Sequence, residues 1–278
     1  MPVQRCIHRR PDNLSLPSLA AVLAFICFRP GSKMADELFE GAVKSFLVFG
    51  LIHAVGHHTV PASVSKDMKR ADLAYWASSV ASTLHGVYVS SAAWKAMSDG
   101  GYWTSEDLEL VTPAALHCCQ VYLGYLAADT IPLLLHAKEW AGSELYLVHH
   151  ALSLFSWSLM SMRGQLLAIA VGLLLLEATA PFTNGRWFMS KCGITSGPIF
   201  MANGVLFALS FLVLRVLLMG GLLVRYAVVL RGAFFALPTS TYLTVLGSYA
   251  FGYPLQLFWF NKIVKGLLKL LSGKKKPT

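Results

Sequence analysis

The sequence predicts an all-α, polytopic integral membrane protein, a bundle of about seven transmembrane helices (six to eight). Hydrophobic residues make up 55% of the 278 residues and charged residues only 13%, about half the share that soluble domains carry. The mean hydropathy is +0.56. Long apolar runs, such as 166–176 and 205–219, favour helices over the ~10-residue alternating segments of a membrane barrel.

Seven apolar segments are expected to cross ~30 Å of hydrocarbon as helices, in which every backbone amide bonds internally. They cover residues 36–55, 72–96, 114–136, 146–162, 164–181, 198–223 and 240–268. Pro181 is expected to end the fifth helix, because proline removes a backbone hydrogen bond. Gly252 and Pro254 predict a kink in the seventh. Residues 36–268 are thus expected to form one membrane domain, followed by a basic tail at 269–278.

The first 35 residues allow two interpretations. Residues 14–28 are apolar, which is short for a span but long enough for the core of a signal or transit-like segment. The following Arg29-Pro30-Gly31-Ser32 lacks a small-x-small cleavage site. An extra helix or membrane anchor therefore also stays open.

Basic residues give the chain a formal net charge of +9 and gather at predicted helix ends and in the C-terminal tail. The loops at 57–71 and 182–197 are basic, whereas the loop at 97–112 is acidic. The positive-inside rule then predicts a cytosolic C-terminus, although Arg225 and Arg231 fall on the other side. This arrangement suits lipid headgroups, so we expect membrane lipids, and no nucleic acid, as partners.

The chain ends in Lys275-Lys276-Pro277-Thr278. Two lysines at these positions of a cytosolic tail resemble the dilysine retrieval signal of endoplasmic reticulum proteins, an address that a receptor reads. The endoplasmic reticulum is therefore the expected location. An ordinary basic flank of the last helix is the alternative.

The five cysteines show neither Cys-x-x-Cys nor metal-ligand spacing. We expect no metal, no cofactor and no disulfide framework. The adjacent Cys118 and Cys119 are expected to be small buried hydrophobic residues.

Ionisable residues within the predicted spans are the candidates for function, because each costs at least ~2.5 kcal/mol to insert. His149 and His150 begin the fourth span. Adjacent residues point ~100° apart on a helix, so the two cannot serve one metal from one face. One histidine is expected to face a cavity and the other a backbone carbonyl or a neighbouring helix. Histidine suits proton transfer, and a pair of interfacial histidines is the alternative.

Asp129 lies within the third span. Tyr122, Tyr125, Asp129 and His136 recur at i, i+3, i+7 and i+14, which places them in one stripe on one helix face. That stripe must face protein or water, either for function or only to fix packing. His85, beside Gly86 in the second span, carries the same two alternatives.

Glu177 lies four residues before Pro181, which frees the carbonyl of residue 177 from its usual bond. The turn expected beyond contains Asn184, Arg186 and Trp187. An ion pair between Glu177 and Arg186 would either lock the helix end or line a cavity. The sequence has no Gly-x-Gly-x-x-Gly, Walker, Gly-x-Ser-x-Gly or zincin motif.

Three segments together resemble the TLC-domain family, named for the TRAM, Lag and CLN proteins. They are GYLAADTIPLLLH (124–136), the His149-His150 pair and LEATAPFTNGRWF (176–188). The last span is similar to the family's C-terminal helix, so the resemblance covers about residues 40–268. The small TLC-domain proteins of the transmembrane protein 56 type share the Pro-Phe-x-Asn-x-Arg-Trp-Phe segment. The resemblance implies a role in lipid metabolism or homeostasis.

Ceramide synthases, more distant members, transfer an acyl chain from acyl-CoA to a sphingoid amine. His149 and His150 match their His-His pair, whereas Leu176 and Glu177 stand about where their His-Asp pair would be. The resemblance thus implies acyl transfer, with acyl-CoA as co-substrate, but not ceramide synthesis in particular. Either histidine would act as base or transient acyl carrier, and Asp129 or Glu177 would orient the imidazole. The substrate would contact Tyr122, Tyr125, His85, Asn184, Arg186 and Trp187.

A second hypothesis is a non-catalytic membrane protein that binds or senses lipid, regulates bilayer composition or escorts cargo. A sealed interior would favour it, whereas convergence of the histidines, Asp129 and Glu177 on one cavity open to the bilayer would favour acyl transfer. A transporter is disfavoured, because Pro181 and Pro254 do not lie at matching places of two related halves.

Overall fold

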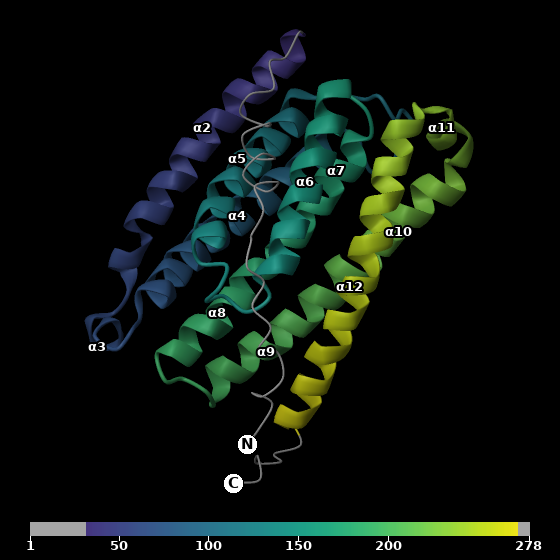
Figure 1. Ribbon diagram of the computed structural model, residues 1–278. Coiled ribbons are helices and arrows are strands. Elements are labelled where there is room, and N and C mark those ends of the chain that lie inside the picture. The colour runs from purple at the N-terminus through teal and green to yellow at the C-terminus, as the bar shows by residue number, and fades with distance from the viewer. Residues whose placement is uncertain (1–31, 272–278) are drawn as a thin grey trace.

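The computed structural model of the chain describes residues 32–271, which form helices and short connections (Figure 1). The elements are α2 (Lys33–Gly56), η1 (His57–Thr59), α3 (Ala62–Ser65), α4 (Arg70–Asp99), α5 (Pro113–Leu135), α6 (Ser143–Arg163), α7 (Leu167–Leu174), η2 (Leu175–Thr179), α8 (Ala180–Lys191), α9 (Pro198–Ser210), η3 (Phe211–Leu218), α10 (Met219–Val224), η4 (Arg225–Val229), α11 (Arg231–Ala236) and α12 (Thr239–Leu271). The apolar segment at 14–28 and the lysines at 275–276 lie outside the described residues.

Each of the seven predicted spans corresponds to a helical segment, and the prediction of an all-α membrane protein is confirmed. Four segments within residues 32–271 are long and apolar enough to cross a membrane. They are Lys33–Thr59, Pro113–Leu135, Leu167–Lys191 and Pro198–Val229. Crossing by α4, α6 and α12, which would bring the number to seven, stays a prediction.

Helix starts follow from capping residues in the sequence. The Ser32 side chain accepts a hydrogen bond from Ala35 N at the start of α2, and Thr112 does the same for Ala115 N at the start of α5. Pro113 then occupies the first turn of α5, where its missing N–H leaves no intrahelical bond unmade.

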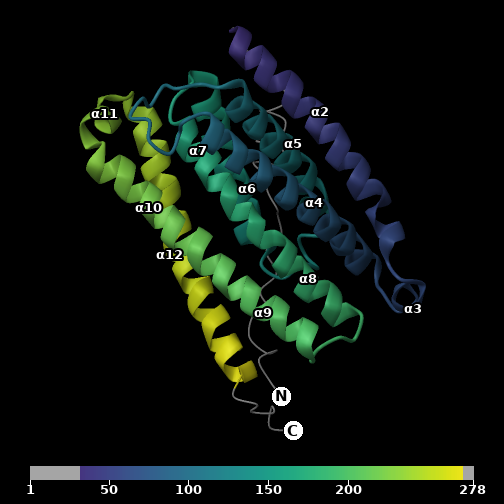
Figure 2. The same ribbon diagram turned by 180° about the vertical axis from the view of Figure 1, so that it is seen from behind.

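The helices form an inner group and a peripheral pair (Figures 1 and 2). Helix α5 contacts α2, α4, α6 and α7. In an apolar 18-residue stretch of α5, 67% of the residues are buried. The segment Pro198–Val229 pairs with α12 beside this group. Only 22% of the residues in an apolar 18-residue stretch of this segment are buried. Its exposed apolar side chains suit lipid, and it winds into π-helical turns at η3 and η4.

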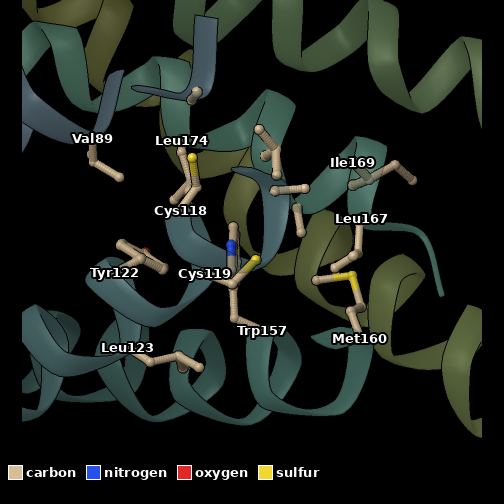
Figure 3. Packing of buried hydrophobic residues seen from close by; sticks show 14 of the residues in the cluster. Val89, Cys118, Cys119, Tyr122, Leu123, Trp157, Met160, Leu167, Ile169 and Leu174 are labelled. Carbon is tan, nitrogen blue, oxygen red and sulfur yellow. The ribbon is translucent and has the colours of Figure 1, made fainter. Parts of the chain in front are cut away.

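Aliphatic, sulfur-containing and aromatic side chains fill the core between α5, α6 and α7 (Figure 3). Cys118 and Cys119 are buried there with free thiols, as predicted. Tyr122, Leu123 and Trp157 belong to the same cluster.

The prediction that the fifth helix ends at Pro181 is wrong. The chain tightens into the 3₁₀ turn η2 and then continues as α8 to Lys191, with Pro181 in the first turn of α8. Proline is tolerated there because the first N–H groups of a helix have no intrahelical partner. Asn184, Arg186 and Trp187 therefore lie on a helix and not in a turn.

Basic and acidic connections lie at opposite ends of α4. The connection before α4 holds Lys66 and Lys69, and the connection after it holds Glu106 and Asp107. An ion pair of 2.9 Å joins Lys191 Nζ to Asp72 Oδ1, which brings the end of α8 to the basic end.

Candidate functional site

Five polar side chains surround or include Asp129 in the interior of the bundle. We call them the Asp129 cluster (His53, Ser78, Asp129, Thr130 and His150). Ser78 Oγ donates a 2.5 Å hydrogen bond to Asp129 Oδ1. His53 Nε2 lies 3.4 Å from Oδ1, and His150 Nε2 lies 3.7 Å from Oδ2. These side chains come from α2, α4, α5 and α6, so one carboxylate ties together four helices.

The sequence analysis did not select His53 as a site residue, and the structure places it in the Asp129 cluster. Its side chain is only 11% exposed and faces Asp129. By contrast, the following His57 and His58 are exposed at the helix end. A histidine one turn inside an apolar run was the available signal, because burying it requires a partner.

His150 has a hydrogen bond at one ring nitrogen and a longer contact with a carboxylate at the other. Thr130 Oγ1 lies 2.9 Å from His150 Nδ1, and the same hydroxyl donates to Leu126 O at 2.6 Å. Because a hydroxyl has one proton, Nδ1 of His150 is the donor in this contact. His150 thus directs Nδ1–H to Thr130 and Nε2 to Asp129.

His149 faces a different space, which we call the His149 cavity. It has a volume of about 90 Å³ and lies among α6, η2, η3 and α12. His149 is exposed at its edge, as are Leu152 and Phe251. The polar and aromatic side chains that line it include Tyr122, His149, Trp157, Glu177, Arg215, Tyr249 and Gln256. The expectation that adjacent histidines diverge is met, and the four residues do not converge, because neither Asp129 nor His150 lines the cavity.

Glu177 pairs with Arg215, not with Arg186. Arg215 Nη2 lies 3.8 Å from Glu177 Oε1, which is beyond hydrogen-bonding distance. Arg215 Nε donates to Thr179 Oγ1 at 2.8 Å, and Nη1 lies 3.5 Å from Gln256 Oε1. The guanidinium is therefore anchored through Nε, and the Arg215 side chain lines the cavity.

The Asn184–Trp187 segment packs α8 against its neighbours. Asn184 Nδ2 donates to Ser79 O and Thr83 Oγ1 on α4. Arg186 lies over the ring of Phe200 at 4.1 Å, and Trp187 contacts Tyr75 and Trp76. None of the three is among the residues that line the His149 cavity.

His85 is fully buried in an aromatic enclosure. Its ring stacks on Tyr125 at 3.8 Å between centroids and meets the edge of Phe49. Neither ring nitrogen has a hydrogen-bond partner within residues 32–271. The neighbouring Gly86 allows close approach, since a Cβ there would lie 2.6 Å from Glu177 O. This contact sets how closely η2, and hence Glu177, approaches α4.

Arg215 and Gln256 were missed by the sequence analysis. A lone cation in the apolar run 205–219 was the signal, because such a charge needs a buried partner. Within the described chain, no three His, Cys, Asp or Glu side chains are placed to hold a metal ion.

The fold and this site define a multi-pass helical membrane protein whose ionisable side chains face the bundle interior. Residues 75–265 match the TLC domain, and the chain belongs to the TLC-domain family.

Relatives in three animals carry the family name. The chain is 26% identical over 264 residues to TLC domain-containing protein 4-A of Xenopus laevis, covering 91% of this chain and 95% of that one. It is 26% identical over 211 residues to TLC domain-containing protein 4-B of Danio rerio (72% and 76%). Against TLC domain-containing protein 4 of Homo sapiens it is 28% identical over 153 residues (54% and 57%). No solved structure matches the chain.

Proposed function

We propose that the protein transfers an acyl group from acyl-CoA to the amine or hydroxyl of a membrane lipid at the His149 cavity. The single observation that carries this proposal is that His149 and Glu177 line one cavity whose edge is exposed. A base, a carboxylate and lateral access are the three features that such a transfer needs.

His149 takes the proton of the acceptor group, whose nitrogen or oxygen attacks the thioester carbonyl carbon. The bond from the acyl carbon to sulfur breaks, the bond to the acceptor forms, and the proton passes to the thiolate of coenzyme A. Glu177 stabilises the protonated imidazole across the cavity. His150 and Asp129 position the start of α6 from the opposite side.

Labelled acyl-CoA presented with lysolipids and sphingoid bases tests this proposal with the purified full-length protein. We expect product from the wild type and a loss of ~10²–10⁴-fold in His149→Ala, the range for a general base. His57→Ala is the matched control, because His57 is exposed at the end of α2. Equal rates in His149→Ala and wild type would retire the proposal.

A second candidate function is non-catalytic lipid binding, and the cavity volume favours it. About 90 Å³ is far below the roughly 300–1,000 Å³ of pockets that enclose whole ligands. A headgroup fits inside, while the acyl chains stay in the bilayer. Absence of product from folded protein, with melting that still responds to lipid, would favour this function.

We also propose seven membrane crossings, with the basic end in the cytosol and residence in the endoplasmic reticulum. The separation of basic and acidic connections along α4 supports this orientation. In intact microsomes an impermeant maleimide should label Asp67→Cys, whereas it should label Asp107→Cys only after the membrane is permeabilised. Labelling of both from one side would contradict it.

A further inference from the structure

The ion pair in the His149 cavity is incomplete. Glu177 and Arg215 approach to 3.8 Å, whereas the Lys191–Asp72 pair closes to 2.9 Å in a more exposed setting. Both side chains of the cavity pair are less than a fifth exposed. Opposite charges that stop short of a hydrogen bond in an apolar site leave binding capacity on each partner.

Two residues that line the same cavity, Trp157 and Tyr249, each carry a hydrogen-bond donor without a partner. Trp157 Nε1 and Tyr249 Oη are buried and have none within residues 32–271. The residues themselves are 8% and 3% exposed. Buried polar groups are nearly always hydrogen-bonded. Together with the outer nitrogens of Arg215, these donors favour a ligand rich in acceptor oxygens.

The acceptor side of the cavity is Glu177. A carboxylate accepts bonds from an ammonium group, so the cavity offers donors for an anion next to an acceptor for a cation. A zwitterionic group with a primary ammonium and a phosphate matches both. A quaternary ammonium has no N–H to donate, and a headgroup without an amine leaves Glu177 unused.

From these contacts we infer that the His149 cavity binds the phosphoethanolamine headgroup of a membrane lipid, with its phosphate on Arg215 and its ammonium on Glu177. This inference rests on the proposed function, of which it names the lipid class. The exposed edge at His149, Leu152 and Phe251 lets the glycerol and acyl chains remain in the bilayer. Where transfer occurs, the ammonium on Glu177 first releases one proton to solvent at the exposed edge, and the resulting amine is the acceptor that gives a second proton to His149 as it attacks.

Binding of short-chain lipids to the purified full-length protein tests the inference without requiring turnover. Phosphatidylethanolamine, phosphatidylcholine and phosphatidic acid with identical chains are titrated and followed by native mass spectrometry. We expect phosphatidylethanolamine to bind at least ~10-fold tighter than either, the scale of one charged hydrogen bond. Equal affinity for the three lipids would overturn the inference.

Variants assign the two halves of the headgroup. Arg215→Gln should abolish binding of phosphatidylethanolamine and phosphatidic acid, while Glu177→Gln should remove only the preference between them. The double variant Glu177→Gln/Arg215→Gln leaves no unpaired charge and checks that loss of binding is not loss of folding. Arg225→Gln is the matched control, since Arg225 donates to Ser105 O outside the cavity. Unchanged selectivity in Glu177→Gln would contradict the placement of the ammonium.

Three further outcomes test the lipid source and separate this inference from the proposed function. Soluble phosphoethanolamine that competes as tightly as the lipid would make the free compound the ligand and overturn the lipid source. Selective binding of phosphatidylethanolamine without acyl transfer would retire the proposed reaction and keep the headgroup site. Acyl transfer without that selectivity would do the reverse.

Discussion

The Asp129 cluster and the His149 cavity each receive one of two adjacent histidines of α6, and they differ in construction. His150 enters the first, where a hydroxyl and a carboxylate face its two nitrogens. His149 enters the second, where Arg215 Nη2 stops 3.8 Å from Glu177 Oε1 and two lining residues carry donors without partners. In the cluster the two ring nitrogens of His53 also lack a hydrogen bond within residues 32–271. The cluster joins α2, α4, α5 and α6, whereas the cavity lies where η2 and α6 meet η3 and α12.

This difference teaches which polar groups of a membrane bundle hold it together and which wait for a ligand. A polar group with partners on several helices stabilises their packing. A group at an open edge with incomplete partners contributes less to folding and is available for binding. Substitutions in the two regions should therefore separate stability from function.

The largest effect on stability is expected from Asp129→Ala. This change leaves the Ser78 hydroxyl without its acceptor and removes the carboxylate that faces His53 and His150, so the free energy of unfolding should fall by about 2–4 kcal/mol. Glu177→Gln should cost less than half of that, because its pair is already loose. Denaturant unfolding in micelles measures both, and similar losses would break the comparison.

Two glycine contacts provide an intermediate effect. A Cβ at Gly124 would strike Ala42 O of α2, and a Cβ at Gly86 would strike Glu177 O. Each substitution to alanine should cost about 1–3 kcal/mol through overpacking. Only Gly86→Ala should also weaken ligand binding, since it displaces η2.

Gly50→Ala is the control for both glycine variants. A Cβ at Gly50 meets open space, and alanine is the better helix former, so stability should rise by about 0.5–1 kcal/mol. Loss of binding in Gly124→Ala at the level of Gly86→Ala would show that the two regions are coupled.

The smallest effect on stability is expected from His149→Ala, below about 0.5 kcal/mol, as for substitutions away from packed features. His150→Ala should cost about 1–2 kcal/mol, because Thr130 and Asp129 each lose a partner. Thermal unfolding of the two variants side by side gives the difference. A larger loss in His149→Ala would reverse the assignment of the two regions.

Sequence patterns predicted the bundle well and the site in part. Each of the seven apolar segments corresponds to a helical segment, because hydropathy and length are properties of a single stretch of chain. Tyr122 was correctly placed on a protein-facing stripe with Asp129. The Glu177–Arg186 pair was wrong, because α8 continues as a helix and turns Arg186 towards Phe200. The proposed catalytic roles stay predictions.

By itself the sequence determined an all-α membrane protein, its helical segments and the divergence of two adjacent histidines, because each depends on composition or on the ~100° step of one helix. Only the tertiary structure decided that His53 meets Asp129 and that Arg215 meets Glu177. These partners lie far apart in the chain, and the approach of helices at glycines such as Gly86 and Gly124 sets which side chains come into reach.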